Sequence, residues 1–163
     1  MEREELATQL VATWRRHNDI LLYLLAEIPA DGLRVVPIGS KGRMVAEQFA
    51  HLDSVRRGWL HYHETGKRPT RTPVRKGQPP TRAQLKKNLV ASGREVERFL
   101  ERAVHEDVRP RMFGRQVVRW IGYLIAHESH HRGQVMLALK QNGVRLTERV
   151  ALQGLWGTWI FGK

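Results

Sequence analysis

The segment His127-Glu128-Ser129-His130-His131 contains the residues of this chain best suited to do chemistry. Its first and last histidines are four residues apart, so on a helix they lie on one face, one turn from each other. Two imidazoles placed in this way can bind one transition-metal ion, which then needs a third ligand from elsewhere in the chain. Apolar residues flank the pair at helical spacing, which predicts that both rings point toward the core.

The third ligand has to come from the remaining histidines of the eight in the chain. His51 is the best candidate, because it lies in the middle of a predicted helix and borders its apolar stripe. The other histidines have settings that argue against sharing the ion. His17 follows two arginines in a polar, surface-like stretch, and His61, His63 and His105 lie near predicted helix ends, where we expect exposure. His130 is rotated by about 100° from the pair.

Four long segments repeat apolar residues at helical spacing, over residues ~3–28, ~43–64, ~82–104 and ~114–141. Ser40 is the expected N-cap of the second helix, Thr81 opens the third, and Asn142-Gly143 closes the fourth. No strand pattern of useful length is present. The pattern predicts an all-α fold in which residues 1–163 form a single domain, a four-helix bundle with a short C-terminal helix or tail from Leu152 to Phe161.

The stretch between the second and third helices, residues 65–81, contains four prolines and no acidic residue. It reads as a long loop without regular structure. Seventeen extended residues reach at most about 55 Å, whereas a 22-residue helix is about 33 Å long. The loop can therefore run back along the bundle, and we expect a crossover that makes helices two and three parallel.

The composition narrows the class of protein. With 163 residues, 41% hydrophobic and 27% charged, the chain suits a soluble globular protein. No apolar run approaches the ~18 residues of a membrane span, and the acidic N-terminal residues are not typical of a signal peptide, so we expect a cytoplasmic protein without membrane contact. The absence of cysteine excludes disulfides, thiolate ligands and a cysteine nucleophile. The net charge of +12 leaves nucleic-acid binding open, although no nucleic-acid motif accompanies it.

The two histidine-containing blocks resemble the signatures of a known family. The runs Met44–Leu52 and His127–Gln134 look like those of the DinB-like (YfiT-like) metal-dependent enzymes, and the resemblance extends from the first helix through Gly143. It implies a four-helix bundle with a crossover, often a homodimer. It also implies a divalent metal, zinc or nickel, held by His51, His127 and His131. Related families transfer low-molecular-weight thiols such as bacillithiol, mycothiol or glutathione onto small electrophiles, or isomerise substrates with the help of a thiol.

A site with three imidazole ligands agrees with such chemistry. Three neutral rings leave the ion its full charge and an open position, where the pKa of a bound water or thiol falls toward neutrality. Because the chain lacks cysteine, the thiol would arrive as a cofactor with a small-molecule substrate. Glu128 could act as a general base, or form a surface ion pair with Arg132 at i+4. Gln134 lies on the same helix face as His127 and could orient a ligand. These two residues are the candidate catalytic groups; residues that bind the thiol remain unassigned.

Two other functions compete with the thiol S-transferase. The run His127–His131 also matches the H-E-x-x-H pattern of zinc proteases, which makes a metal-dependent hydrolase an alternative. Against a protease, no strand is available to hold a peptide, and Gln134 and Leu137 stand where one protease class has glycine and histidine. The second alternative is a non-catalytic basic bundle that binds nucleic acid or protein, with Arg75, Lys76, Arg82, Lys86 and Lys87 on one face.

Overall fold

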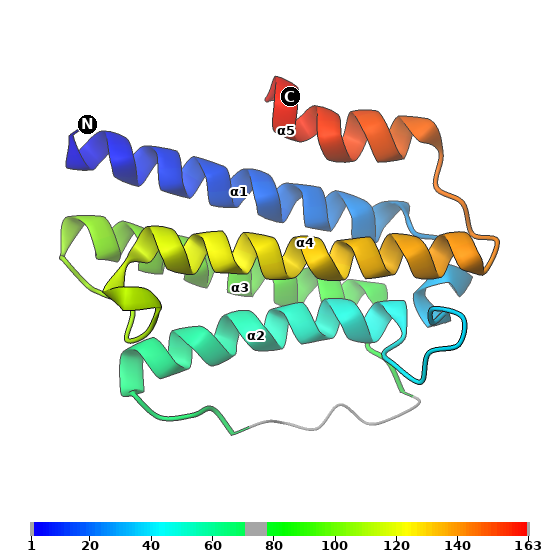
Figure 1. Cartoon of the computed structure of the whole chain (residues 1–163), viewed down its shortest axis with the longest axis horizontal. Coiled ribbons are helices and arrows are strands. Elements are labelled where there is room, and N and C mark those ends of the chain that lie inside the picture. Colours follow the sequence, from blue (N-terminus) through cyan, green and yellow to red (C-terminus); the bar gives the residue numbers. More distant parts are fainter. Residues whose placement is uncertain (1, 71–77, 163) are drawn as a thin grey trace.

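The computed structural model describes residues 2–70 and 78–162 of the chain. Its long helices lie side by side as a bundle (Figure 1). They are α1 (Arg3–Glu27), α2 (Val45–Thr65), α3 (Arg82–His105) and α4 (Val117–Gln141). The described residues contain no strand. The predicted all-α four-helix bundle is confirmed, and each helix begins and ends within three residues of its predicted bounds.

The bundle contains the predicted crossover. In Figure 1, α1 and α4 run in one direction along the bundle, whereas α2 and α3 both run in the other. The end of α2 and the start of α3 therefore lie at opposite ends of the molecule, and the chain between them must run the length of the bundle. Residues 66–70 and 78–81 lack helical structure, as expected for this loop. Its middle, residues 71–77, lies outside the described residues.

The C-terminal segment is helical, as predicted. A π-helix, η3 (Arg149–Gly157), continues into the short α5 (Thr158–Phe161). Both contact α1, and the segment lies along the outer side of that helix (Figure 1). Two short 3₁₀ turns, η1 (Asp31–Arg34) and η2 (Phe113–Arg115), complete the connections.

The helix ends are mostly those that the sequence indicates. Thr81 caps α3 in a reciprocal arrangement: its N–H donates to Oε1 of Gln84 at 2.8 Å, and the N–H of Gln84 donates to the Thr81 hydroxyl at 3.3 Å. Asn142 ends α4, and Gly143 adopts a φ of 76°, the left-handed conformation that glycine accepts without a Cβ clash.

The predicted cap at Ser40 is wrong. Helix α2 begins later, with Met44 as its N-cap, and the N–H of Met44 donates to Oε2 of Glu47 at 2.8 Å. The Ser40 hydroxyl instead accepts from the N–H of Gly42 at 2.9 Å. Serine side chains form such local turns as readily as they cap helices, and here the turn holds Ser40 in the connector.

The interior consists of two apolar clusters separated by polar side chains. One cluster takes its helical residues from the C-terminal part of α1, the N-terminal parts of α2 and α3, and the end of α4. The other takes them from the start of α1, the C-terminal parts of α2 and α3, and the start of α4. Between the two clusters, each helix contributes one fully buried polar residue. We call these four residues the buried polar layer: His17, Arg56, Ser92 and Glu128.

Candidate metal centre

The structure brings the three predicted histidines together. His51 lies on α2, and His127 and His131 lie one turn apart on α4. One nitrogen from each ring lies within 4.8 Å of those of the other two. The ring centroids are 5.4 Å apart for His51 and His127, 4.8 Å for His51 and His131, and 4.7 Å for His127 and His131. A tetrahedral ion with bonds of about 2.0–2.1 Å holds its ligand atoms about 3.3–3.4 Å apart, so the ring nitrogens that lie farthest apart have to approach each other by about 1.5 Å.

The surroundings of two rings of the cluster favour their neutral form. Burial, followed by the neighbouring rings of His127 and His51, lowers the pKa of His131 to about 4. Burial also lowers the pKa of His127. A neutral imidazole offers an unprotonated nitrogen at neutral pH, which is the form that binds a metal. His127 and His131 therefore have the protonation state that a cation site requires.

His127 has a buried nitrogen that needs a partner. Its Nδ1 atom is buried and makes no hydrogen bond within the described part of the chain. Its ring stacks on Tyr123, with centroids 5.7 Å apart and planes at 23°. An unsatisfied buried nitrogen costs free energy, and such sites call for an unseen partner such as an ion. The three-histidine cluster therefore fits a divalent metal.

Gln48 is a member of the site that the sequence analysis missed. It lies on α2 three residues before His51, and only 5% of it is exposed. Its Oε1 atom is 2.5 Å from Nδ1 of His131. The spacing places Gln48 on the same face of α2 as His51, a signal that could have marked it as a neighbour of the third ligand.

Glu128 is buried rather than on the surface, with 1% of it exposed. The predicted surface ion pair with Arg132 is therefore wrong. The two partners are Arg56, which donates from Nε and Nη2 to the two carboxylate oxygens at 2.7 Å each, and His17, which donates from Nε2 at 2.9 Å. Burial by itself raises the pKa of Glu128, but the charge and hydrogen bonds of Arg56, with those of His17, outweigh it and hold the pKa at about 2.

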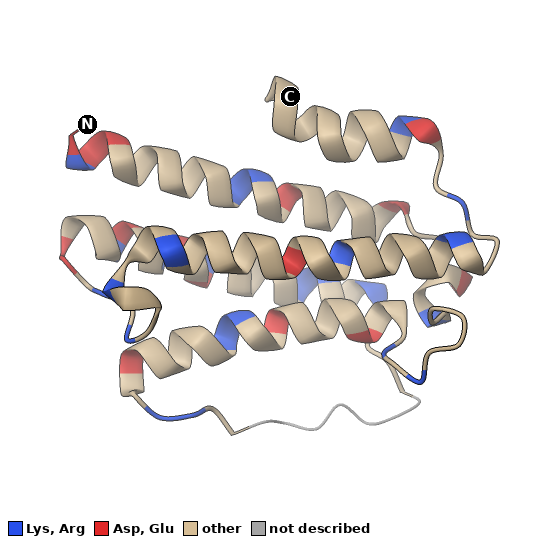
Figure 2. Cartoon of the chain, viewed as in Figure 1, with Lys and Arg blue, Asp and Glu red and all other residues tan. Residues whose placement is uncertain are grey.

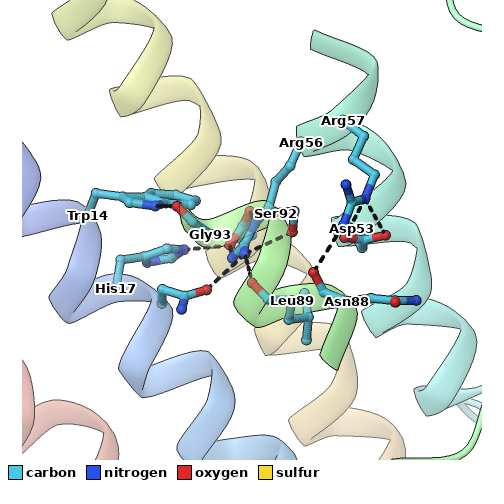
Figure 3. Close-up of polar contacts among 11 residues, drawn as sticks. Trp14, His17, Asp53, Arg56, Arg57, Asn88, Leu89, Ser92 and Gly93 are labelled. Atoms are coloured by element: carbon cyan, nitrogen blue, oxygen red, sulfur yellow. Dashed lines mark hydrogen bonds and ion pairs between the residues drawn. The ribbon is translucent and has the colours of Figure 1, made fainter. Parts of the chain in front are cut away.

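The buried polar layer ties the four long helices together (Figure 3). Beyond Glu128 on α4, the Arg56 guanidinium donates from Nη1 to Oδ1 of Asn18 on α1 at 2.8 Å and to the carbonyl of Leu89 on α3 at 3.1 Å. The Ser92 hydroxyl on α3 lies 3.5 Å from the same nitrogen. Buried charges are tolerated when they are paired and hydrogen-bonded, and Arg56 meets both conditions.

Two histidines are more buried than their local sequence indicates. His17, expected at the surface, is 1% exposed, and His63, expected to be exposed, is 6% exposed. The His63 ring packs against Phe99 and Trp120, with centroids 5.3 and 5.0 Å away. For His17 the sequence contained a signal that was missed. This residue follows the buried Trp14 by three residues, and residues at this spacing lie on the same face of a helix. The expected exposure of His61 and His105 is confirmed, and His130 is exposed as well.

Gln134 contacts a different ring from those of the cluster. Its Nε2 atom is 2.8 Å from Nε2 of the exposed His130. Its proposed part in orienting a bound ligand stays a prediction.

The basic charge is spread over the molecule (Figure 2). Arg82, one of the residues of the predicted basic face, donates from Nη1 to the carbonyls of Leu25 and Ala26 at 2.7 Å each, and so caps the end of α1. Arg75 and Lys76 lie outside the described residues. Within the described part of the chain, no helix is both long and apolar enough to cross a membrane.

Comparison with known proteins agrees with this architecture. Among curated proteins, no match to the chain is found. The family model of the DinB family matches residues 1–156, nearly the whole chain. The match includes both histidine-bearing helices and the buried polar layer between them. The chain belongs to the DinB family.

Proposed function

We propose that this protein is a metal-dependent enzyme whose divalent ion, zinc or nickel, is held by His51, His127 and His131. The observation that carries the proposal is that one nitrogen from each of the three rings lies within 4.8 Å of the others. The rings belong to two different helices, and His51 and His131 are 80 residues apart in the sequence. Imidazole suits both ions. Three neutral ligands leave the ion its charge and a coordination position for a substrate.

We propose thiol S-transfer onto a small electrophile as the reaction. When bound, the metal would act as a Lewis acid and lower the pKa of a coordinated thiol, whose thiolate is the nucleophile. The chain has no cysteine, so the thiol has to be a separate cofactor. Arg43 is exposed and close enough to the cluster that, after burial and the neighbouring rings, its charge also lowers the pKa of His131. That cation would attract a carboxylate-bearing thiol to the site.

Glu128 supports the transferase over a protease. A general base needs a free lone pair within reach of the water that it activates. The Glu128 carboxylate is only 1% exposed, and its oxygens accept hydrogen bonds from Arg56 and His17, so it lies out of reach of such a water. We infer that Glu128 positions α4, and a hydrolase built on this site would need another base. Hydrolysis that proceeds without added thiol and survives Glu128→Gln would favour a hydrolase of that second kind.

A homodimer is part of the proposal. The family resemblance implies one, and the C-terminal segment exposes apolar side chains on its outer side: Leu152, Trp156, Ile160 and Phe161. Exposed apolar patches of this kind mark interaction surfaces. Light scattering after size exclusion tests it: a dimer is expected for the native chain, and a monomer would refute it.

Elemental analysis tests the metal site directly. The native protein, dialysed against zinc or nickel and then against metal-free buffer, is expected to retain one ion per chain. The triple variant His51→Ala, His127→Ala, His131→Ala is expected to retain none. The loaded protein is then supplied with bacillithiol, mycothiol or glutathione and monobromobimane, and the rate at which the conjugate forms is compared by mass spectrometry with the rate without protein. Equal metal content in both proteins would refute the site, whereas a loaded protein that does not exceed the uncatalysed rate would refute only the transferase.

A further inference from the structure

We propose that Gln48 is a positioning residue of this metal centre: its amide oxygen holds the His131 ring with the proton on Nδ1, so that Nε2 faces the ion. The inference rests on the proposed function, because it assigns the nitrogen through which one ligand would bind. Gln48 itself is not one of the three proposed metal ligands.

The geometry assigns the proton. The Oε1 atom of Gln48 is 2.5 Å from Nδ1 of His131, and both side chains are buried. An amide oxygen only accepts hydrogen bonds, so Nδ1 has to donate. A neutral imidazole carries one N–H, and its other nitrogen then keeps an unshared pair. In His131 that nitrogen is Nε2.

The contact fixes the ring of one ligand. His131 has a buried acceptor for its second nitrogen. Metal-binding histidines commonly donate their second N–H to such an acceptor, which orients the ring and raises its basicity. Helix α2 therefore serves the site twice, by offering His51 as a ligand and by holding a ligand of α4 through Gln48.

Zinc affinity is the first test. We expect Gln48→Met, which keeps the length and removes the acceptor, to bind Zn²⁺ about 10–100-fold more weakly than the native protein in competition with a chromophoric chelator. Gln48→Glu restores an acceptor and is expected to bind within a few-fold of the native protein. Gln9→Met, the same change at an exposed position of α1, is the matched control and is expected to leave the affinity unchanged. The Co²⁺ absorption spectrum should change in Gln48→Met alone.

The second test needs no metal. ¹⁵N NMR of the imidazoles in the zinc-free native protein is expected to show the proton of His131 on Nδ1, and a mixture of tautomers in Gln48→Met. A native His131 protonated on Nε2 would overturn the inference even if the variant fails to fold. Native-like zinc affinity in a folded Gln48→Met would also overturn it. If the native protein binds no Zn²⁺, the proposed function fails, and the NMR result still decides the role of Gln48.

Discussion

Neighbouring residues of α4 belong to two regions with opposite properties. His127 and His131 face the three-histidine cluster, where two of the three rings are partly exposed. Glu128, one residue further along, faces the buried polar layer, where the carboxylate is paired with Arg56 and His17. Both regions place polar atoms inside the bundle. The layer pairs its charges, whereas the cluster brings one nitrogen from each of three rings within 4.8 Å of the others without a charged partner among them.

The two regions are expected to contribute to different properties, one to the stability of the fold and the other to metal binding. Removing one member of a buried ion pair lowers the stability of the protein strongly, because the charge of the other member stays buried without a partner. Neutral rings that face one another contribute little without a cation and gain their value when one binds. We therefore expect changes in the layer to affect stability and changes in the cluster to affect metal binding.

The largest effect is expected from Arg56→Met, which leaves the Glu128 carboxylate buried without its cation. The free energy of unfolding of the zinc-free protein should fall by about 3–5 kcal/mol, measured by urea denaturation at pH 7. The matched control is Arg57→Met, at the next position of α2, whose ion pairs with Asp53 and Glu95 are partly exposed. It should cost about 0.2–1 kcal/mol. Equal losses in the two variants would contradict the distinction between the regions.

A substitution in the three-histidine cluster should abolish the effect of zinc on stability and change the stability of the zinc-free protein little. Zinc at 100 times its dissociation constant should stabilise the native protein by about 2.7 kcal/mol, and a chelator should remove that gain. In His51→Ala, zinc should no longer shift the urea midpoint, while the zinc-free stability changes little because the ring is only partly buried. His61→Ala, at an exposed position of the same helix, should keep the full zinc effect. A zinc-dependent shift that persists in His51→Ala would show that the ion binds elsewhere.

His63 provides a pH-dependent test in a third setting, among aromatic rings. Burial, then the charge of Arg111, lowers its pKa to about 4, so between pH 6.5 and 4 the unfolded chain binds the proton more readily. Its contribution to stability is therefore present at pH 7 and lost as the pH falls through that window. Native protein should lose about 1–3 kcal/mol more than His63→Phe between pH 7 and pH 4. Parallel stability profiles for the two proteins would exclude this role.

The smallest effect is expected from Ser92→Ala, within the layer itself. The Ser92 hydroxyl is buried but lies 3.5 Å from Arg56, at the limit of hydrogen bonding. Arg56 keeps its other acceptors in the variant, so urea denaturation should show a loss of no more than about 1 kcal/mol. A loss as large as that of Arg56→Met would mean that the layer depends on every member equally.

Local sequence patterns were enough to predict the four long helices and the three histidines of the cluster. Apolar spacing predicted all four long helices, and the i, i+4 spacing of His127 and His131 with the position of His51 predicted the cluster. The length of residues 65–81 predicted the crossover. Each of these depends on relations within one helix or one loop. The same reasoning failed for His17, whose polar neighbours in sequence suggested the surface, and for His63, whose position near a helix end suggested exposure. Both residues lie on the side of their helix that faces the core.

The sequence by itself determined the helical periodicity, the order of the elements and the one-turn spacing of His127 and His131 on α4, because these depend on 3.6 residues per turn and on chain length. Only the tertiary structure decided the partners across helices. Glu128 meets Arg56 from 72 residues away, and Gln48 meets His131 from 83 residues away. Such pairs depend on the rotation and depth at which helices pack, and many side chains along the chain compete for them until the bundle is assembled.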